Sequence, residues 1–340
     1  MLAFSDGDLR AATLEMHDLV RRSLLVQAVS VAAMLGVADL LDGRALTAEE
    51  LAEATGADAP TLYRLLRALS GLGLFVEDGE HRFELTPLGA SLRSGERSAR
   101  EVAVFFGEPF VWAAWGDLHH SVMTGEPAFR HTHGVGLFEY VRDDLDAGSA
   151  FHGWMTRQSK LQVPVVLAAY DFSRFRKLVD VGGGQGGLLA AILEANPALT
   201  GVLYDLPQVV GEGKVRSAGV GPRCEVVGGN FFDSVPEGGD CYLLKLVIHD
   251  WDDEKAVEIL RNVRAATADN ATVLLLEFVI PPGNEYHHSK FMDLNMLLLA
   301  EGGRERTEAE YRELLEKAGL TLTRIVPTTS PLSIIEGTPT

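Results

Sequence analysis

Residues 178–210 read LVDVGGGQGGLLAAILEANPALTGVLYDLPQVV, and their pattern indicates how this half of the chain folds. A short apolar run ends at Val181, a glycine-rich turn and an apolar helical stretch follow, and a second apolar run ends at Asp205. A buried strand, a glycine turn, a helix and a second buried strand are the repeating unit of parallel α/β sheets. The sequence therefore predicts that this half of the chain is built on such a sheet.

The glycines of this turn indicate a ligand site. Gly182, Gly184 and Gly187 match the spacing of dinucleotide-binding loops, in which glycine lets the backbone turn tightly and approach a ligand. Asp205 ends the next strand, where its carboxylate could hold two ribose hydroxyls. Because NAD and S-adenosylmethionine both contain such a ribose, these features leave both cofactors open.

Short apolar runs continue to the C-terminus, and helical patterns separate them. Asp252 opens a helix whose apolar face is Val257, Leu260 and Val263, and Thr307 with Glu310 forms a capping box for a second helix. We therefore expect a doubly wound, Rossmann-like α/β domain with its ligands at the carboxyl ends of the strands. The expected strands cover residues 178–181, 202–206, 224–227, 242–248, 272–280, 321–326 and 332–337.

The N-terminal half is predicted to be mainly helical. Thr47 and Glu50 form a capping box, and a second helix starts at Asp58 and ends near Gly71. Residues 75–86 then predict a hairpin that turns at Asp78-Gly79. Two helices followed by a hairpin suggest a winged helix, which binds DNA in some proteins and serves for packing or dimerisation in others.

Charge argues against nucleic acid as a partner. Residues 47–93 contain eight acidic and four basic residues, and the whole chain has 48 acidic and 30 basic residues, a formal charge of −18. An acidic surface repels phosphate, so we interpret the winged helix as a packing or dimerisation module.

A membrane span is the alternative for residues 23–41, which are long and apolar enough to cross a bilayer. The stretch contains Gln27, Gly36 and Asp39 and lies between polar segments, so we predict a helix that is buried on all sides. The first ten residues are polar and acidic and do not resemble a secretion signal. The chain has two cysteines, Cys224 and Cys241, too few for a disulfide framework, and we expect a cytoplasmic protein.

The glycine stretch and its neighbours resemble one known family. Together with the segments HDWDDE (249–254) and GGRERT (302–307), they are similar to the S-adenosylmethionine-dependent O-methyltransferases of the plant caffeic-acid type and of bacterial polyketide (small-molecule) biosynthesis. The resemblance continues through VVGGNFFDSVP (226–236) and LLLEFVIPP (274–282) and covers nearly the whole chain. It implies that the cofactor is S-adenosylmethionine, with S-adenosylhomocysteine as its product.

The resemblance also implies which residues bind the cofactor. The glycine loop would hold the methionine end of the cofactor, Asp205 its ribose, and Asn230 and Phe231 its adenine. The implied cofactor-binding residues are Ser159, Asp180, Gly182, Gly184, Asp205, Leu206, Asn230, Phe231 and Lys245.

His249 is the candidate general base. It follows an expected strand at the ligand edge of the sheet, and imidazole titrates near neutrality, so it suits removal of a proton from an acceptor hydroxyl. A strand-end histidine is otherwise often a hydrogen-bonded structural residue. The resemblance implies that His249 is the base and places two carboxylates beside it, Glu277 and Glu305.

An aromatic acceptor would suit methionine and aromatic side chains, which grip a planar ring. Met292 and Met296 could equally be helix core, and Trp154 could pack between domains, whereas a buried Asn295 needs hydrogen-bond partners. The candidate acceptor-binding residues are Trp154, Met155, Trp251, Met292, Asn295 and Met296.

Histidines also occur in pairs, at 119 and 120, at 131 and 133, and at 287 and 288. Because no cysteine or carboxylate lies near them at a recognised ligand spacing along the chain, we expect no metal site.

These features predict an enzyme with two domains. Residues 1–160 would form a helical, winged-helix-like domain that dimerises and contributes to the acceptor pocket, and residues 161–340 would bind S-adenosylmethionine. The expected reaction is methylation of a hydroxyl on an aromatic natural product, a polyketide or a phenol, by a homodimer. The alternative is a relative on the same fold that has replaced methyl transfer with hydroxylation, decarboxylation or cyclisation of a polyketide.

Overall fold

The computed structural model describes residues 5–95, 98–210 and 221–340. The density of internal contacts divides the chain into two compact units. Met1–Ala113 and Val141–Arg157 form what we call the N-terminal unit, and Ala114–Tyr140 and Gln158–Thr340 form the C-terminal unit. The second unit thus includes an early segment of the chain, residues 114–140, and the domain boundary expected after residue 160 stays a prediction.

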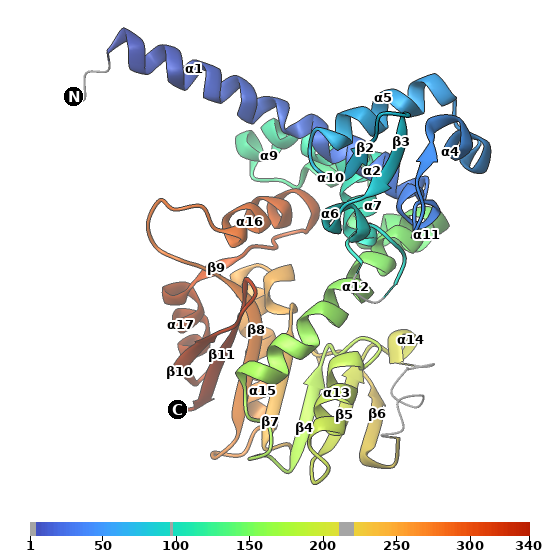
Figure 1. Ribbon diagram of the computed structural model, residues 1–340. Coiled ribbons are helices and arrows are strands. Elements are labelled where there is room, and N and C mark those ends of the chain that lie inside the picture. Colours follow the sequence, from blue (N-terminus) through green and yellow to red (C-terminus); the bar gives the residue numbers. More distant parts are fainter. Residues whose placement is uncertain (1–4, 96–97, 211–220) are drawn as a thin grey trace. The chain divides into compact units, whose positions relative to one another are not determined.

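The C-terminal unit contains an eight-stranded sheet in the order β6-β5-β4-β7-β8-β11-β10, with β9 paired to β8 (Figure 1). The strands from β6 to β8 run parallel, whereas β11 is antiparallel to both its neighbours. The order reverses direction at β4, which places the glycine turn at the switch point where open α/β sheets bind ligands. The predicted doubly wound fold is confirmed. Its strands are β4 Lys177–Val181, β5 Thr200–Asp205, β6 Cys224–Gly228, β7 Cys241–Lys245, β8 Thr272–Ile280, β9 Arg306–Thr307, β10 Leu320–Pro327 and β11 Leu332–Pro339.

Two apolar cores lie on the two faces of this sheet, because neighbouring side chains on a strand point to opposite sides. On β4, Val179 and Val181 pack with α15 and α17, whereas Leu178 packs with α13 and the end of α12. Helices therefore cover both faces, and the parallel strands are apolar on both sides. The helices of this unit are α9 Leu118–Thr124, α10 Ala128–His133, α13 Gly187–Ala195, α14 Pro207–Val210, α15 Asp253–Ala266, α16 His288–Leu299 and α17 Glu308–Lys317, with 3₁₀ turns η2 Gly221–Arg223 and η3 Ile248–Asp250.

The predicted helix caps of this unit are confirmed. The Asp252 side chain accepts the Lys255 amide at the start of α15. Thr307 and Glu310 form a reciprocal capping box at the start of α17.

One expected strand is too long. The apolar run 242–248 predicts a single strand, but β7 ends at Lys245. Leu246 has a φ of +52°, and the chain then turns into η3. The carboxylate of Glu277 accepts the amides of Val247 and Ile248, so these donors are satisfied by a side chain and not by a neighbouring strand. Apolar periodicity alone does not contain this information.

The N-terminal unit contains the predicted helix pair and hairpin. α4 (Ala48–Thr55) has the Thr47–Glu50 capping box and ends at Gly56, and α5 (Ala59–Ser70) is capped by Asp58. β2 (Phe75–Glu77) and β3 (Arg82–Leu85) form the hairpin, and β1 (Leu46–Thr47) adds a third strand on the other side of β3.

The predicted hairpin turn is wrong in its length. The loop spans residues 78–81 instead of turning tightly at Asp78-Gly79, and the positive φ falls on His81, at +59°. The Asp78 carboxylate accepts the amides of Glu80 and Arg82, which favours this longer loop.

The helix predicted for residues 23–41 is broken and only partly buried. α2 (Ser23–Met34) and α3 (Val37–Leu40) are separated at Gly36, whose φ is +66°. Ala32, Ala33 and Val37 are buried, whereas Leu24 is 68% exposed. Among the described helices, none is long and apolar enough to cross a membrane.

The remaining helices of the N-terminal half include a first helix, α1 (Asp6–Arg21), in which no residue is buried. The chain passes between the two units within α8, α11 and α12, so these helices contribute residues to both. Their bounds, with those of the short α6 and of α7, are α6 Pro87–Ala90, α7 Arg100–Gly107, α8 Pro109–Gly116, α11 Leu137–Asp143 and α12 Leu145–Ala169.

Candidate active site

The glycine turn lies at the carboxyl end of β4, where the backbone bends tightly and other atoms approach it closely. Gly182, Gly184 and Gly186 have φ values of +70°, +60° and +77°, which L side chains rarely adopt. A Cβ on Gly182 would lie 2.8 Å from Cγ2 of Val247, and one on Gly183 would lie 2.6 Å from the Asp180 carboxylate. A Cβ on Gly184 would meet no atom within 4 Å, so this glycine borders open space.

Asp205 closes β5 directly beside this turn, as predicted. Its carboxylate accepts the amide of Gly184 at 2.8 Å and that of Leu206 at 2.7 Å. These bonds fix the carboxylate at the sheet edge with lone pairs left over, since each oxygen can accept more than one bond.

Asp180 and Lys245 form the buried polar part of this edge. Asp180 is 2% exposed, and burial raises its pKa to about 7, although Lys245 acts in the opposite direction. Burial also lowers the pKa of Lys245, whereas Asp180 raises it. The Lys245 ammonium donates to Ser159 Oγ at 3.0 Å and to Gln162 Oε1 at 3.3 Å.

Gln162 was not among the residues predicted from sequence. The signal for it is its place three residues after Ser159 on one helix, which brings both side chains to the same face.

Asn230 and Phe231 follow β6 on the same edge. The Asn230 carbonyl oxygen accepts the Phe232 amide at 3.1 Å, which leaves its oxygen with a second lone pair. Its amide NH₂ donates to none of the described residues. Trp251, predicted to contact the acceptor, packs edge-to-face on Phe232, with 4.8 Å between ring centroids, and lies 6.2 Å from Phe231. The structure thus groups Trp251 with the residues expected to hold adenine.

His249 lies in η3, just beyond β7, with carboxylates on both sides of its ring. Its Nδ1 is 2.9 Å from Glu305 Oε1 and 4.0 Å from Glu277 Oε2. Its Nε2 is 3.6 Å from an oxygen of Asp250. The histidine and the two glutamates predicted from the motif are therefore brought together, from η3, β8 and the loop before β9.

Electrostatics make this imidazole a strong base. Burial by itself would lower the pKa of His249, but the three carboxylates, Asp250, Glu305 and Glu277, outweigh it and raise the pKa to about 10. Burial raises the pKa of Glu277 to about 7, against the opposing effect of His249. One oxygen of Glu277 and one of Glu305 are buried and accept no hydrogen bond from the described residues.

A cation could in principle use the same three side chains, because their ligand atoms lie within 4.8 Å of one another. The hydrogen bonds argue for a proton network instead. Glu277 Oε1 already accepts the amides of Val247 and Ile248, and Glu305 Oε1 is engaged by the ring of His249.

Arg306 holds the turn that carries His249, and sequence reasoning missed it. Its guanidinium is 0% exposed and donates to the carbonyl oxygens of Ile248 and Trp251, and to the carboxylate of Asp253. The backbone amide of Arg304 donates to the carbonyl oxygen of His249 itself at 2.8 Å. Only the fold brings residues 304–306 against residues 248–251, so no local pattern could have found this contact.

The predicted acceptor residues fall in two groups. Trp154 and Met155 belong to the N-terminal unit, where Trp154 stacks on Phe105 with 4.2 Å between ring centroids. Met292, Asn295 and Met296 lie on α16 in the C-terminal unit. Asn295 is 2% exposed, and its oxygen accepts the indole N–H of Trp115 at 3.3 Å, a partner that the sequence did not reveal.

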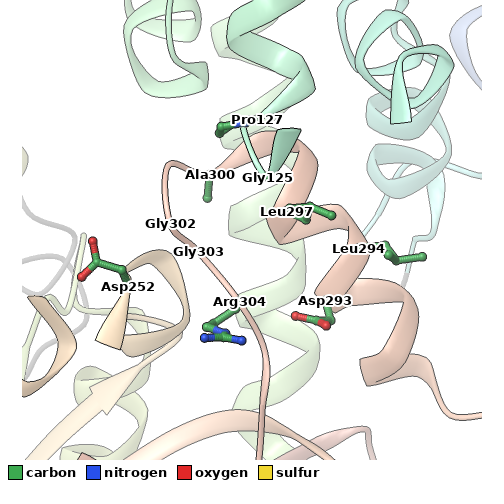
Figure 2. Close-up of a pocket in the computed structure, with 10 residues that line it drawn as sticks. All are labelled: Gly125, Pro127, Asp252, Asp293, Leu294, Leu297, Ala300, Gly302, Gly303 and Arg304. Carbon is green, nitrogen blue, oxygen red and sulfur yellow. The ribbon is translucent and has the colours of Figure 1, made fainter. Parts of the chain in front are cut away.

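A cavity of about 380 Å³ borders α16 on a different face from the one that carries Met292, Asn295 and Met296 (Figure 2). Asp293, Leu294 and Leu297 of that helix line it, opposite Asp252 and beside Arg304. Met292, Asn295 and Met296 are not among its lining residues, which agrees with their different helical positions. The Asp293 carboxylate also accepts the amide of Glu305 at 2.9 Å, so this wall supports the loop beside His249.

The donor set at the sheet edge fits S-adenosylmethionine. The cofactor carries positive charge at its sulfonium and ammonium groups, and two carboxylates, those of Asp180 and Asp205, flank a glycine turn that is crowded at Gly182 and Gly183 and open at Gly184. An aromatic pair and an amide after β6 suit a purine ring.

Comparison with known proteins identifies the family. Residues 115–321 match the O-methyltransferase domain, and residues 17–94 match the O-methyltransferase dimerisation domain. The chain is 43% identical to the phenazine O-methyltransferase PhzM of Lysobacter antibioticus over 93% of both chains. It is 40% identical to the 8-amino-8-demethylriboflavin N,N-dimethyltransferase of Streptomyces davaonensis over 89% of both.

A solved structure of a methyltransferase of calicheamicin biosynthesis, with S-adenosylhomocysteine bound, superposes with a TM-score of 0.89 at 35% identity. That match covers 99% of this chain and all of the other. The chain therefore belongs to the O-methyltransferase family and is an S-adenosylmethionine-dependent methyltransferase that carries this family's dimerisation domain.

Proposed function

We propose that this enzyme methylates a hydroxyl oxygen of an aromatic natural product, a polyketide or a phenol, and that His249 is the general base. The observation that carries the proposal is the 2.9 Å contact between His249 Nδ1 and Glu305, which leaves Nε2 as the ring nitrogen not engaged by a glutamate. The names of relatives such as the phenazine O-methyltransferase support an aromatic acceptor.

S-adenosylmethionine, when bound, supplies an electrophilic methyl group. The acceptor oxygen attacks better without its proton, and His249 Nε2 takes that proton as the bond to carbon forms. Glu305 holds the ring through Nδ1 and stabilises the imidazolium that results, as a carboxylate does for histidine in other acid–base sites. Glu277 acts both on the charge of the ring and on the backbone of the turn, through the amides of Val247 and Ile248.

The raised pKa of His249 suits a phenolic acceptor. A phenol has a pKa of about 10, as in tyrosine, and the pKa of His249 is raised to about 10. Proton transfer between them is then nearly balanced in free energy, so the acceptor becomes an anion at little cost. At neutral pH the same pair, the imidazolium of His249 and the acceptor anion, forms when the protonated enzyme binds an acceptor that has already ionised.

Cofactor binding is proposed for the edge formed by β4, β5, β6 and β7. Gly182 and Gly184 allow close approach of the methionine end, near Asp180, Lys245 and Ser159. Asp205 would take the ribose hydroxyls, with Leu206 beside it. Asn230 and Phe231 would flank the adenine.

We also propose that the enzyme is a homodimer through its N-terminal domain. All residues of α1 are at least partly accessible, and large apolar side chains are exposed along it. Such a surface is rarely left uncovered in a monomer. The exposed apolar residues of α1 are Leu9, Leu14, Met16, Leu19 and Val20. Light scattering at micromolar protein should give twice the mass of 36.8 kDa, and a monomer would contradict the proposal.

The proposed reaction is tested with labelled S-adenosylmethionine and a panel of phenols, hydroxylated polyketides and aromatic amines. We expect label in a methyl ether, and we expect His249→Ala to lower turnover about 10²- to 10⁴-fold while calorimetry shows unchanged S-adenosylhomocysteine binding. Label on nitrogen would refute the choice of oxygen. A product without an added methyl group would favour the non-methylating alternative, and equal turnover of wild type and variant would remove His249 as the base.

A further inference from the structure

We propose that Asp117, His120 and His131 form a binding site for a divalent transition-metal ion, with Zn²⁺ as the reference case. One carboxylate oxygen and one ring nitrogen from each histidine lie within 4.8 Å of one another. Two imidazoles and a carboxylate are a donor set that zinc accepts, with a water in the fourth position. The site is separate from the catalytic cluster around His249.

The fold supplies the ligands that are not neighbours along the chain. Asp117 directly precedes α9, His120 lies in its first turn, and His131 lies in α10. The spacing of 3 and then 11 residues matches no recognised metal motif, which is why the sequence predicted no metal.

The backbone between these helices is fixed independently of any ion. α9 ends at Gly125, which has a φ of +78°. The hydroxyl of Ser121 accepts the amide of Ala128 at 2.9 Å in a buried contact that joins the two helices. The framework is therefore ordered before the ion binds, so that binding would need only side-chain rotations.

The three side chains already lie close together, and ion binding would require only that one ring turns. His131 Nδ1 is 2.6 Å from Asp117 Oδ2, and the rings of His120 and His131 stack in parallel with 3.8 Å between centroids. Zinc–ligand bonds of about 2.0–2.2 Å hold ligand atoms roughly 3.3–3.6 Å apart in a tetrahedron, so one ring must turn for both lone pairs to meet at the ion. The side chain of His131 is 57% exposed and can turn in this way.

An ion at this position would also affect the packing of α9 and α10 on α16. α9 and α10 both pack against α16, and Trp115, two residues before Asp117, donates to Asn295 of that helix. An ion that links α9 to α10 would therefore stabilise the segment that covers α16.

The matched control is His119, the neighbour of His120 on the same helix. Its side chain is exposed and is not part of either group of potential ligands in the described chain. The buried group of His249, Glu277 and Glu305 has similar ligand distances, so the experiment must also separate it from the proposed site.

The test is calorimetric titration of the full-length protein with Zn²⁺, repeated for His131→Ala, Asp117→Asn, His119→Ala and His249→Ala. We expect one site per chain, weakened at least tenfold in His131→Ala and Asp117→Asn and unchanged in the other two, because even outer-shell changes cost about 10- to 100-fold in metal affinity. Asp117→Asn keeps the side-chain shape, so it serves if His131→Ala melts early by circular dichroism.

A second measurement uses Co²⁺ in place of Zn²⁺. Its visible absorption reports ligand geometry, and we expect tetrahedral-type bands in the wild type and in His119→Ala that disappear in His131→Ala. Equal Zn²⁺ affinity in wild type and His131→Ala, or loss of the site in His249→Ala alone, would overturn the proposal.

Discussion

Arg306 donates a hydrogen bond from its fully buried guanidinium to the carbonyl oxygen of Ile248, the residue before His249, at 3.1 Å. The same guanidinium reaches the carbonyl oxygen of Trp251 at 2.8 Å, so one side chain holds both ends of the turn that carries His249. Its neighbour Glu305 bonds the ring of His249. The backbone of the turn and the orientation of the ring are thus fixed by two consecutive residues of one segment.

Replacing the guanidinium fork should therefore misplace His249 without removing a charge. We expect Arg306→Lys to lower kcat by about 10²-fold, because an error of about 1 Å in the position of a catalytic group has that cost. The affinity for S-adenosylhomocysteine should stay within about threefold of the wild type, since Arg306 contacts none of the glycine turn, Asp205 or Asn230, which follow β4, β5 and β6. Steady-state kinetics and calorimetry measure the two quantities.

The control for this variant is Arg312→Lys. Arg312 lies on α17, is 44% exposed in its side chain and pairs with Glu308 on the same helix. It should have nearly wild-type kcat and stability. An Arg306→Lys enzyme that loses cofactor affinity and kcat in parallel would indicate general unfolding and contradict a positioning role.

Removing the Glu305 charge should move the pH dependence of the reaction. Glu305 favours the imidazolium, so Glu305→Gln lowers the pKa of His249 from about 10, by roughly 1–3 units. As the proposed base, His249 must be neutral to accept a proton, so activity should rise with pH through this pKa, and the rise should move to lower pH in the variant. The plateau should also fall, because a less basic imidazole is a weaker proton acceptor.

The profile of kcat/KM against pH, from roughly pH 6 to 10, measures both effects. Glu301→Gln is the comparison variant, because Glu301 lies in the same loop, is 54% exposed and pairs with Arg130. Its profile should coincide with that of the wild type. A Glu305→Gln profile that also coincides with it would show that Glu305 does not set the basicity of His249.

Asp180 should make cofactor binding depend on pH near neutrality. Burial raises the pKa of Asp180 to about 7, so its carboxyl is partly protonated at neutral pH in the free enzyme. A cation at the methionine end favours the carboxylate, and the affinity for S-adenosylhomocysteine should therefore increase as pH rises through about 7. The change approaches tenfold per pH unit below that pKa.

Calorimetric titration with S-adenosylhomocysteine at several pH values tests this dependence. Asp180→Asn should bind more weakly and show little change across the same range. Adenosine lacks the amino-acid part of the ligand, and its affinity should vary little with pH in the wild type. A dependence that persists in Asp180→Asn would assign it to another group.

The elements that sequence predicted well are those decided by neighbouring residues. The capping boxes at Thr47 and Thr307 and the cap at Asp252 lie where the pattern places them, because each involves residues three apart. The apolar runs predicted the parallel strands because they too consist of residues that are neighbours in the sequence. His249, Glu277 and Glu305 came from a motif, and the structure brings them together.

What sequence missed depends on contacts between distant segments. β7 ends at Lys245 because Glu277 takes the amides that would have continued the strand, and those residues are 29 and 30 positions apart. No local sequence pattern indicates the contacts of Arg306 and Trp115, since their partners lie on other elements. The hairpin loop differs because the Asp78 side chain competes for backbone amides that a two-residue turn would leave unbonded.

Gly182 combines a positive φ with a close contact, so it should tolerate substitution poorly. Alanine there must adopt a φ of +70°, which costs about 1–2 kcal/mol, and its Cβ would lie 2.8 Å from Cγ2 of Val247. We expect Gly182→Ala to lower the free energy of unfolding by about 2–5 kcal/mol, the sum of strain and overpacking, and to weaken S-adenosylhomocysteine binding. Denaturant unfolding and calorimetry measure the two effects.

Gly187→Ala is the stability control, because a Cβ on this first residue of α13 meets no atom within 4 Å and its backbone φ is not positive. It should stabilise the fold by about 0.4–1 kcal/mol, since alanine restricts the unfolded chain. The double variant Gly182→Ala with Val247→Ala removes the close contact but not the strain, so it should recover part of the ligand affinity. If Gly182→Ala matched Gly187→Ala in stability, the turn would have to be far more adaptable than its positive φ and its contact with Val247 indicate.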